Sequence, residues 1–159
     1  ARHPGLIRKF GGHAMAAGLT LAERDFAVFQ ALFDAEVGSL LGPDDLHGIL
    51  HSDGKLEPHE LTLELAEMLR LAGPWGQHFP EPLFDGRFVV VNQRVVGEAH
   101  LKLSVRPPAT EITFDAIYFG AAAGIGDISG REVQLAYRVD ANEFRGVRSV
   151  QLVVEHLVE

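Results

Sequence analysis

Hydrophobic positions recur with a helical period in the first part of the chain. Between residues 20 and 42 they are spaced at steps of three or four, which places them on one face of a helix. Thr20 and Glu23 have the spacing of a capping box, and Gly42-Pro43 follows the last apolar position, so we predict a helix between these signals. Its apolar stripe consists of Phe26, Phe29, Phe33, Val37 and Leu40. We expect the three phenylalanines to pack in a hydrophobic core.

A second helix is predicted from about Pro58 to Ala72. Gly73-Pro74 follows directly and supplies a C-terminal stop. The apolar stripe of this helix consists of Leu61, Leu65, Met68, Leu69 and Ala72. The acidic stretch 44–58 that separates the two helices is punctuated by Asp53-Gly54, and we place a domain junction there.

After the second helix the hydrophobic period changes from about 3.6 residues to 2, the period of half-buried strands. The predicted strands are Arg87 to Val96, His100 to Arg106, Glu111 to Phe119, Glu132 to Asp140 and Val147 to Leu157. The alternation is clearest at Leu101, Leu103 and Val105 and at Val133, Leu135, Tyr137 and Val139. Gly97-Glu98-Ala99 fits a tight hairpin turn, and Gly120 to Gly130 leaves room for a loop or one helical turn.

The number and spacing of these strands suggest an OB-type barrel. Such a barrel has five short strands with a break between the third and the fourth. A generic five-stranded sheet would produce a similar pattern, so the strand pattern alone leaves both architectures open.

Composition narrows the class of protein. The chain has 159 residues, 47% hydrophobic and 23% charged, which suits one ordinary domain or two small ones and excludes a disordered chain. The absence of cysteine excludes a disulfide framework and a thiolate zinc site, and it fits a cytoplasmic protein. No apolar run approaches the roughly 20 residues that cross a bilayer, and no secretory signal is visible. The chain starts Ala-Arg-His-Pro and its first methionine is Met15, so we expect the tail of a longer protein.

The charge is unevenly distributed. A net charge of −8 argues against a protein that coats nucleic acid by bulk attraction. Acids outnumber bases between residues 45 and 85, whereas bases outnumber acids in the stretch 86–106 that follows. These bases are Arg87, Arg94, Lys102 and Arg106. A mildly basic patch on an acidic body is therefore expected.

The most specific string in the chain is Gly11-Gly12-His13-Ala14-Met15-Ala16-Ala17-Gly18. Paired glycines let a backbone approach a ligand closely and expose consecutive N–H groups, which suits a phosphate. The adjacent His13 adds a hydrogen-bond donor whose charge responds to that phosphate. A tight structural turn explains the same residues without any ligand, and both interpretations stay open.

Three weaker signals favour ordinary structure over chemistry. His47 and His51 are four residues apart with His59 nearby, but no fourth ligand stands at a zinc-site spacing. Gly124-Ile125-Gly126 lacks the third glycine of a dinucleotide fingerprint and the lysine of a phosphate-binding loop. Trp75 is interpreted as a packed anchor of the interdomain corner.

The glycine-rich string resembles the G-G-H-x-x-A-A-G motif of the DHH-associated domain of DHH-superfamily phosphoesterases. The downstream segments narrow the resemblance to the C-terminal portion of the RecJ family, the bacterial single-strand-specific 5′-to-3′ DNA exonucleases. These segments, in order, are Met68-Leu69-Arg70, Gly73-Pro74-Trp75-Gly76, Phe79-Pro80-Glu81-Pro82-Leu83-Phe84, Val96-Gly97, His100-Leu101-Lys102 and Asn142-Glu143-Phe144-Arg145-Gly146.

The resemblance implies an α+β chain with two parts. Residues 1–44 would be the end of an α/β DHH-associated domain, and residues 45–159 a five-stranded OB-type barrel with a preceding helix. In the family, an N-terminal DHH domain holds the catalytic manganese or magnesium. No DHH string occurs here, so we expect no catalytic residue, metal site or cofactor in this chain and no nuclease activity from it alone.

The resemblance also implies the binding residues. In the glycine-rich string, the substrate-backbone contacts would be Gly11, Gly12, His13, Ala16, Ala17 and Gly18. OB barrels bind single strands on the face of strands two and three, between the loops that join strands 1–2 and 4–5. The first loop leads into the outward-facing His100, Lys102 and Arg106. The second, from Ala141 to Val147, carries Asn142, Phe144 and Arg145, with Arg148 just beyond. Phe144 is also readable as a core plug.

The expected function is to grip single-stranded DNA and guide it toward a catalytic core outside these residues, in DNA recombination and repair. Single-strand-binding protein is a second expected partner, because its acidic tail would suit a basic barrel surface. The alternative is a protein-interaction barrel that barely touches DNA. The net charge favours this alternative, and the grouping of Lys102, Arg145 and Arg148 opposes it.

Overall fold

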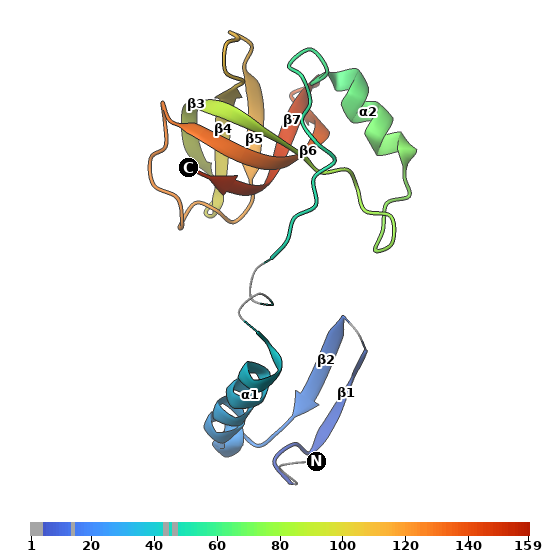
Figure 1. Ribbon diagram of the computed structural model, residues 1–159, viewed down its shortest axis with the longest axis vertical. Coiled ribbons are helices and arrows are strands. Elements are labelled where there is room, and N and C mark those ends of the chain that lie inside the picture. Colours follow the sequence, from blue (N-terminus) through green and yellow to red (C-terminus); the bar gives the residue numbers. More distant parts are fainter. Residues whose placement is uncertain (1–4, 14, 43–44, 46–47) are drawn as a thin grey trace. The chain divides into compact units, whose positions relative to one another are not determined.

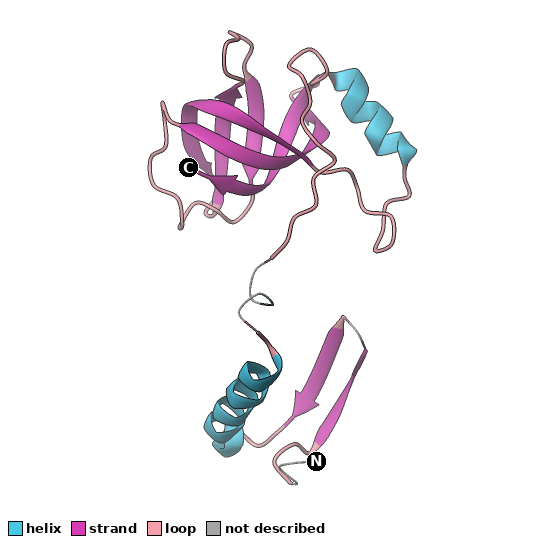
Figure 2. Ribbon diagram, in the orientation of Figure 1, coloured by secondary structure: helices cyan, strands magenta, loops and turns pink. Residues whose placement is uncertain are grey.

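The computed structural model describes residues 5–13, 15–42, 45 and 48–159 of the chain. The chain divides into two compact units, Ala1–Ile49 and Leu50–Glu159 (Figure 1). The boundary between the units falls inside the acidic stretch 44–58. Figure 2 shows that the first unit combines one helix with two strands, and that the second is mostly strands.

The first unit begins with a β-hairpin that the sequence did not predict. Strand β1 (Lys9–His13) pairs with β2 (Ala16–Thr20) in antiparallel register, Gly12 opposite Ala17 and His13 opposite Ala16. All of its described residues are exposed, so no alternation of apolar and polar residues marked the strands.

Helix α1 (Phe26–Leu40) starts later than the capping-box signal indicated. Thr20 is the last residue of β2, and a short 3₁₀ turn, η1 (Glu23–Asp25), precedes the helix. The residue that caps the helix is Asp25, and its side chain makes no capping hydrogen bond. The Thr20/Glu23 capping box is therefore wrong, because pairing with β1 holds Thr20 in an extended strand.

The apolar stripe of α1 is not buried by any described residue. Phe26 and Phe33 are 57% and 56% exposed, and the unit contains no buried residue among those described. The rings of Phe29 and Phe33 stack on each other at 5.5 Å. The predicted core packing of the three phenylalanines is wrong for this structure, because one helix and a two-stranded hairpin offer too little surface to enclose them.

The second unit is a closed five-stranded barrel. Its strands are β3 (Phe84–Val96), β4 (His100–Arg106), β5 (Phe114–Tyr118), β6 (Glu132–Phe144) and β7 (Val147–Val158). They close in the order β3-β4-β5-β7-β6, with β3 paired to β6, and only the β5–β7 pair is parallel. This order identifies an OB-type barrel and confirms the predicted fold class.

The barrel core follows the predicted alternation. Leu101, Leu103 and Val105 are buried, and the residues between them face outward. Tyr137 lies fully buried among these side chains, with its ring edge-on to Phe88 at 5.5 Å. Its hydroxyl has no hydrogen-bond partner among the described residues, and burial, aided by the charge of Asp85, raises the pKa of Tyr137.

Helix α2 (Leu63–Ala72) packs against β6 and β7. It starts later than predicted because the Thr62 hydroxyl caps it by accepting a hydrogen bond from the backbone N–H of Leu65 (3.1 Å), whereas residues 58–60 form a turn. It ends at Gly73 as predicted. Trp75 anchors the segment that follows, because its indole N–H donates to the Leu69 carbonyl (3.1 Å). Among the described residues no helix has both the length and the apolarity to cross a membrane.

Strands β6 and β7 extend beyond the barrel as a two-stranded arm, residues 141–150. In this arm they pair only with each other, from Ala141 opposite Val150 to Phe144 opposite Val147. The predicted loop from Ala141 to Val147 is wrong. Arg145 and Gly146 have φ angles of 53° and 79°, and two positive φ values in sequence make the tight turn that keeps hairpin strands paired to its base.

Candidate nucleic-acid interface

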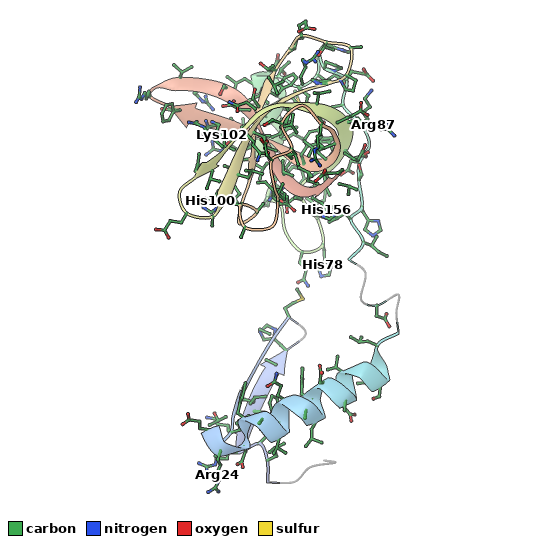
Figure 3. All side chains as sticks on the ribbon, turned by 90° about the vertical axis from the view of Figure 1, so that its left-hand side faces the viewer. Arg24, His78, Arg87, His100, Lys102 and His156 are labelled. Atoms are coloured by element: carbon green, nitrogen blue, oxygen red, sulfur yellow. The ribbon has the colours of Figure 1, made fainter. Side chains whose placement is uncertain are left out.

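The outer surface of β4 carries the polar residues that the alternation predicted. His100, Lys102, Ser104 and Arg106 are half-exposed, and the residues between them are buried in the barrel. Figure 3 shows His100 and Lys102 on the same side of the barrel, with Arg87 on the other side in that view. The strand therefore presents two of the predicted binding side chains together.

Lys102 is already engaged by an acidic neighbour. Its Nζ lies 2.8 Å from a carboxylate oxygen of Asp115 on β5, and the Lys102 side chain is only 22% exposed. A phosphate that binds Lys102 has to compete with this carboxylate.

A polar hollow of about 290 Å³ surrounds this ion pair. Its lining residues are Asn92, Arg94, Lys102, Leu103, Ser104 and Asp115. Arg94 on β3 stands directly opposite Lys102 on β4, is exposed, and forms no ion pair with any described residue. The hollow thus contains two cations and one carboxylate.

Arg94 was not among the predicted binding residues. It belongs to the basic stretch 86–106, which was the only signal for it. The register of β3 shifts at a bulge between Val90 and Asn92, so simple alternation did not assign Arg94 to a face.

Arg106, at the far end of β4, is committed to the connection that follows the strand. Its guanidinium donates to the Thr110 carbonyl (2.7 Å) and pairs with Glu111 (3.2 Å). These contacts hold the segment 107–111 against the end of β4. They leave the Arg106 guanidinium less available for a phosphate than that of Arg94.

His100 forms the other end of the β4 surface, together with an aromatic residue that the sequence analysis missed. The Nδ1 atom of His100 accepts a hydrogen bond from the backbone N–H of Gly120 (3.1 Å). Its ring meets Phe119 edge-on at 5.1 Å, and Phe119 is 60% exposed. Phe119 was predicted at the end of the strand Glu111 to Phe119, whereas β5 ends at Tyr118, and the contact with His100 depends on the barrel register.

The arm carries the second group of predicted residues. Phe144 is 65% exposed, so the alternative interpretation of it as a core plug is wrong. The Arg145 guanidinium lies 5.1 Å from the centre of the Phe144 ring, and Asn142 pairs with Ser149 lower on the arm. Arg145 forms no ion pair with a described residue, which leaves its charge available at the tip.

Arg148 stabilises the arm from the side. Its guanidinium contacts Glu67 of α2 at 2.6 Å, with both side chains partly exposed. The predicted grouping of Lys102, Arg145 and Arg148 is thus divided between the β4 surface and the arm, with only Arg145 unpaired.

The glycine-rich string lies in the β1–β2 hairpin of the first unit. A Cβ on Gly12 would come within 2.7 Å of the Ala17 Cβ, so pairing within the hairpin itself requires this glycine. Gly11 and Gly18 stand opposite each other and have open space where a side chain would be. His13 Nδ1 accepts from the Met15 backbone N–H (3.5 Å) and helps to close the turn.

The described residues contain no cluster of three or more metal-binding side chains. His51 and His59 join no such group, and His47 lies outside the described residues. The segment Gly124-Ile125-Gly126 is held on the barrel by Gln93, whose amide donates to the Gly126 carbonyl (3.0 Å) and accepts from Ile128 N–H (3.0 Å). The donor set needed for a catalytic divalent metal is therefore lacking in the described part of the chain.

A larger hollow, of about 500 Å³, lies elsewhere on the barrel and contains none of the predicted residues. Its two cations, Lys55 and Arg87, pair with Glu57 (3.1 Å) and Glu132 (3.2 Å). Size alone therefore does not identify the binding surface.

The sequence matches the family model described as the RecJ OB domain over residues 52–156. Proteins named single-stranded-DNA-specific exonuclease RecJ from Dickeya dadantii and Escherichia coli are 56% and 51% identical to it over 156 residues. Each alignment covers 98% of this chain and 27% of the relative. The chain thus spans about a quarter of the length of the curated relatives it matches.

Solved structures give a consistent picture. The crystal structure of RecJ in complex with Mg²⁺ from Thermus thermophilus matches with a TM-score of 0.65 and 26% identity, over 97% of this chain and 23% of that one. The Mn²⁺ complex of RecJ from the same organism matches with a TM-score of 0.66 and 26% identity, over 97% of this chain and 22% of that one.

Proposed function

The chain belongs to the RecJ OB domain family, and we propose that it is part of a single-stranded-DNA-specific 5′-to-3′ exonuclease of DNA recombination and repair. The resemblance to RecJ predicted from the ordered motifs is confirmed by these relatives. In this proposal the barrel binds the single strand and guides it toward a catalytic centre formed by other residues of the enzyme.

The observation that carries this proposal is the pair of cations at the polar hollow. Arg94 and Lys102 stand opposite each other on the two strands, with Asn92 and Ser104 beside them as hydrogen-bonding groups. Cations spaced along an OB face bind the phosphates of a single strand without regard to base sequence. Lys102, Ser104 and Asp115 of the hollow lie on the second and third barrel strands, β4 and β5, and OB barrels use the face of these strands for oligonucleotides.

The arm would provide a second contact to the same strand. Phe144 presents an exposed aromatic ring at its tip, on which an unpaired base would stack. The Arg145 guanidinium beside this ring has no carboxylate partner among the described residues and would contact a phosphate. Arg148 would support this contact through its ion pair with Glu67, and Asn142 lies lower on the arm opposite Ser149.

We assign residues 1–44 to the end of a DHH-associated domain, with the hairpin as its substrate-facing part. Gly11 and Gly18 support this assignment, because nothing in the hairpin occupies the space of their missing side chains. A DNA backbone would approach closely there. Gly12, His13, Ala16 and Ala17 form the rest of the hairpin beyond Gly11 and Gly18, and they would contact the same DNA backbone.

The residues described here do not fit the metal centre that the family implies. The Thermus structures contain Mg²⁺ and Mn²⁺, but this chain has no described cluster of ligands for either ion. We therefore assign the metal-dependent cleavage step to parts of the enzyme outside these 159 residues.

A second candidate function is supported by the ion pairs. Lys102, Arg106 and Arg148 each contact a carboxylate, and the net charge of −8 disfavours a polyanion. A barrel with most of its cations neutralised would suit a protein partner better than a polyanion. Single-strand-binding protein, the partner that the family suggests, would place its acidic tail at Arg94 and Arg145, which are unpaired among the described residues.

A salt titration of binding to a dT oligonucleotide separates the two functions. Phosphate contacts release counterions, so the logarithm of the affinity should fall linearly with the logarithm of the salt concentration, by roughly 0.7 per contact. We expect measurable binding, with a slope that corresponds to at least two phosphate contacts. Absent or salt-independent binding would favour the protein-interaction function.

A further inference from the structure

We propose that Phe119 and His100 form a stacking subsite for one unpaired base of a single strand. This inference rests on the proposed function, because it specifies a contact that the barrel face would make with DNA. Neither composition nor motif pointed to Phe119.

The first step is the exposure and fixed position of the two rings. Phe119 directly follows β5 and is 60% exposed, so its ring is open to a ligand. His100 holds it edge-on at a centroid distance of 5.1 Å, and the Gly120 N–H fixes the His100 ring through Nδ1 (3.1 Å). The platform is therefore formed before any ligand arrives.

The backbone around the rings is also held in place. Gly97 opens the β3–β4 turn with a φ of 61°, and the Ala99 carbonyl accepts a hydrogen bond from Ala122 N–H (3.0 Å). This bond links the β3–β4 turn to the segment after β5, so the two rings come from elements that are joined to each other.

The second step is the position of the cations. Lys102 lies two residues from His100 on the same outward side of β4, and Arg94 stands opposite Lys102. Two residues along a strand span about 6.6 Å, close to the spacing of successive nucleotides in an extended single strand. A phosphate near Arg94 and Lys102 would therefore bring a neighbouring base to the His100 end of β4, where Phe119 packs on the His100 ring.

The chemistry of the surface favours nucleic acid over an apolar protein segment. The exposed Phe119 ring packs against His100, and the hollow with Arg94 of β3 and Lys102 of β4 lies two residues along β4 from that histidine. An aromatic face next to cations matches the alternating base and phosphate groups of a single strand, and every base offers a face for stacking. The subsite should accept all four bases.

The test uses two oligonucleotides of equal length, one of dT and one of abasic sugar-phosphate. We expect Phe119→Ala to weaken binding of the 159-residue chain to the dT oligonucleotide by about 5- to 100-fold, the effect of removing one base–aromatic stack. The same substitution should leave binding to the abasic oligonucleotide unchanged, because only the base contacts the ring. Phe119→Tyr should restore dT binding.

Phe79→Ala is the matched control, because Phe79 is equally exposed but packs on Trp75 away from β4. It should change neither affinity. If Phe119→Ala leaves dT binding intact, or weakens both oligonucleotides equally, the subsite is refuted while the proposed function stands on wild-type binding. If the wild-type chain binds neither oligonucleotide, both the subsite and the proposed function are overturned.

Discussion

At the scale of single residues, the barrel surface is defined by which cations are paired and which are not. Lys102, Arg106 and Arg148 contact Asp115, Glu111 and Glu67, whereas Arg94 and Arg145 have no carboxylate partner among the described residues. Partly exposed ion pairs are worth at most about 1 kcal/mol, so a phosphate is able to displace these carboxylates. Under the proposed function, pairing should moderate the affinity for DNA without abolishing it.

Asp115 should therefore limit DNA binding. We predict that Asp115→Asn lowers the dissociation constant for a dT oligonucleotide about 2- to 5-fold at low salt, because Lys102 loses its competitor. Glu159→Gln is the matched control, since Glu159 pairs with Arg131 outside the hollow. Equal gains in both variants would indicate a general charge effect instead, and weaker binding by Asp115→Asn would mean that the carboxylate positions Lys102 for DNA.

Tyr137 should make stability depend on alkaline pH. Burial raises its pKa in the folded chain above the value of about 10 expected when unfolded, so folding keeps the hydroxyl protonated. The free energy of unfolding should be constant in this respect below about pH 10 and fall as the pH rises further.

Tyr137→Phe should remove that fall, and near neutral pH it should leave the free energy of unfolding equal to or up to about 1 kcal/mol above wild type. The reason is that the buried hydroxyl has no partner to lose among the residues that the structure describes. Urea unfolding at about pH 7 and about pH 10.5, on either side of the ordinary tyrosine pKa, measures both effects. A loss of stability at neutral pH would show that the hydroxyl is hydrogen-bonded.

At the scale of elements, the sequence predicts the strands that have a buried face. It misses the strands whose only support is pairing with another exposed strand. The alternation at Leu101, Leu103 and Val105 exists because a barrel wall separates core from solvent, so β4 was predicted with its exact bounds. The hairpin β1–β2 has no buried face and left no such pattern. Residues 141–147 of the arm were predicted as a loop because they lie beyond the barrel, whose core gives the strands their alternation.

In the candidate site too, residues placed by strand alternation were predicted, and residues placed by a bulge or by pairing between strands were missed. His100 and Lys102 were placed correctly on the outer face because alternation fixes the face of every residue in a regular strand. Arg94 was missed because a bulge precedes it, and Phe119 because its contact with His100 depends on how β5 pairs with β4. Ion pairs such as that of Lys102 with Asp115 likewise depend on neighbours that are distant in sequence.

Arg145, in the turn of the arm, has an unfavourable backbone conformation at a position that we propose contacts DNA. Arg145 has a φ of 53°, a conformation that favours asparagine or glycine and costs other residues of order 1 kcal/mol. The contact of Arg145 with the exposed Phe144 ring returns about 0.5 kcal/mol. Arg145→Asn should thus raise the free energy of unfolding by about 0.5 kcal/mol while it weakens binding to single-stranded DNA.

Urea unfolding and oligonucleotide binding of the same sample measure these two effects. Gly146→Ala is the comparison variant and should destabilise the chain, because the φ of 79° at this position is unfavourable for alanine. Unchanged DNA binding by Arg145→Asn would show that the arm does not contact the strand.

At the scale of the whole molecule, the proposed function assigns binding and cleavage to different parts of the enzyme. The chain covers 27% of the length of its relatives, and the described residues lack a cluster of metal ligands. The 159-residue chain should release no mononucleotides from single-stranded DNA with either Mg²⁺ or Mn²⁺. Metal-dependent release that a substitution within this chain abolishes would contradict the division.

The exposed apolar face of α1 is consistent with the proposal that this chain is part of a larger enzyme. Phe26, Phe33 and Leu40 are more than half exposed, although their helical spacing is that of a buried face. A stripe of this kind is stable in a folded enzyme only when another layer covers it. The barrel, in contrast, encloses its own core, and we expect DNA binding to depend on this unit.

The most direct test of the account is the salt dependence of binding to a dT oligonucleotide in Lys102→Ala and Arg145→Ala, beside the control Lys55→Ala. Lys55 pairs with Glu57 at the other hollow and has no proposed contact with DNA. Lys102→Ala and Arg145→Ala should each weaken binding regardless of base sequence and reduce the salt slope by roughly 0.7, the value for one single-strand phosphate. Lys55→Ala should change neither quantity. Wild-type slopes in both test variants would contradict the central claim that the barrel face and the arm grip single-stranded DNA.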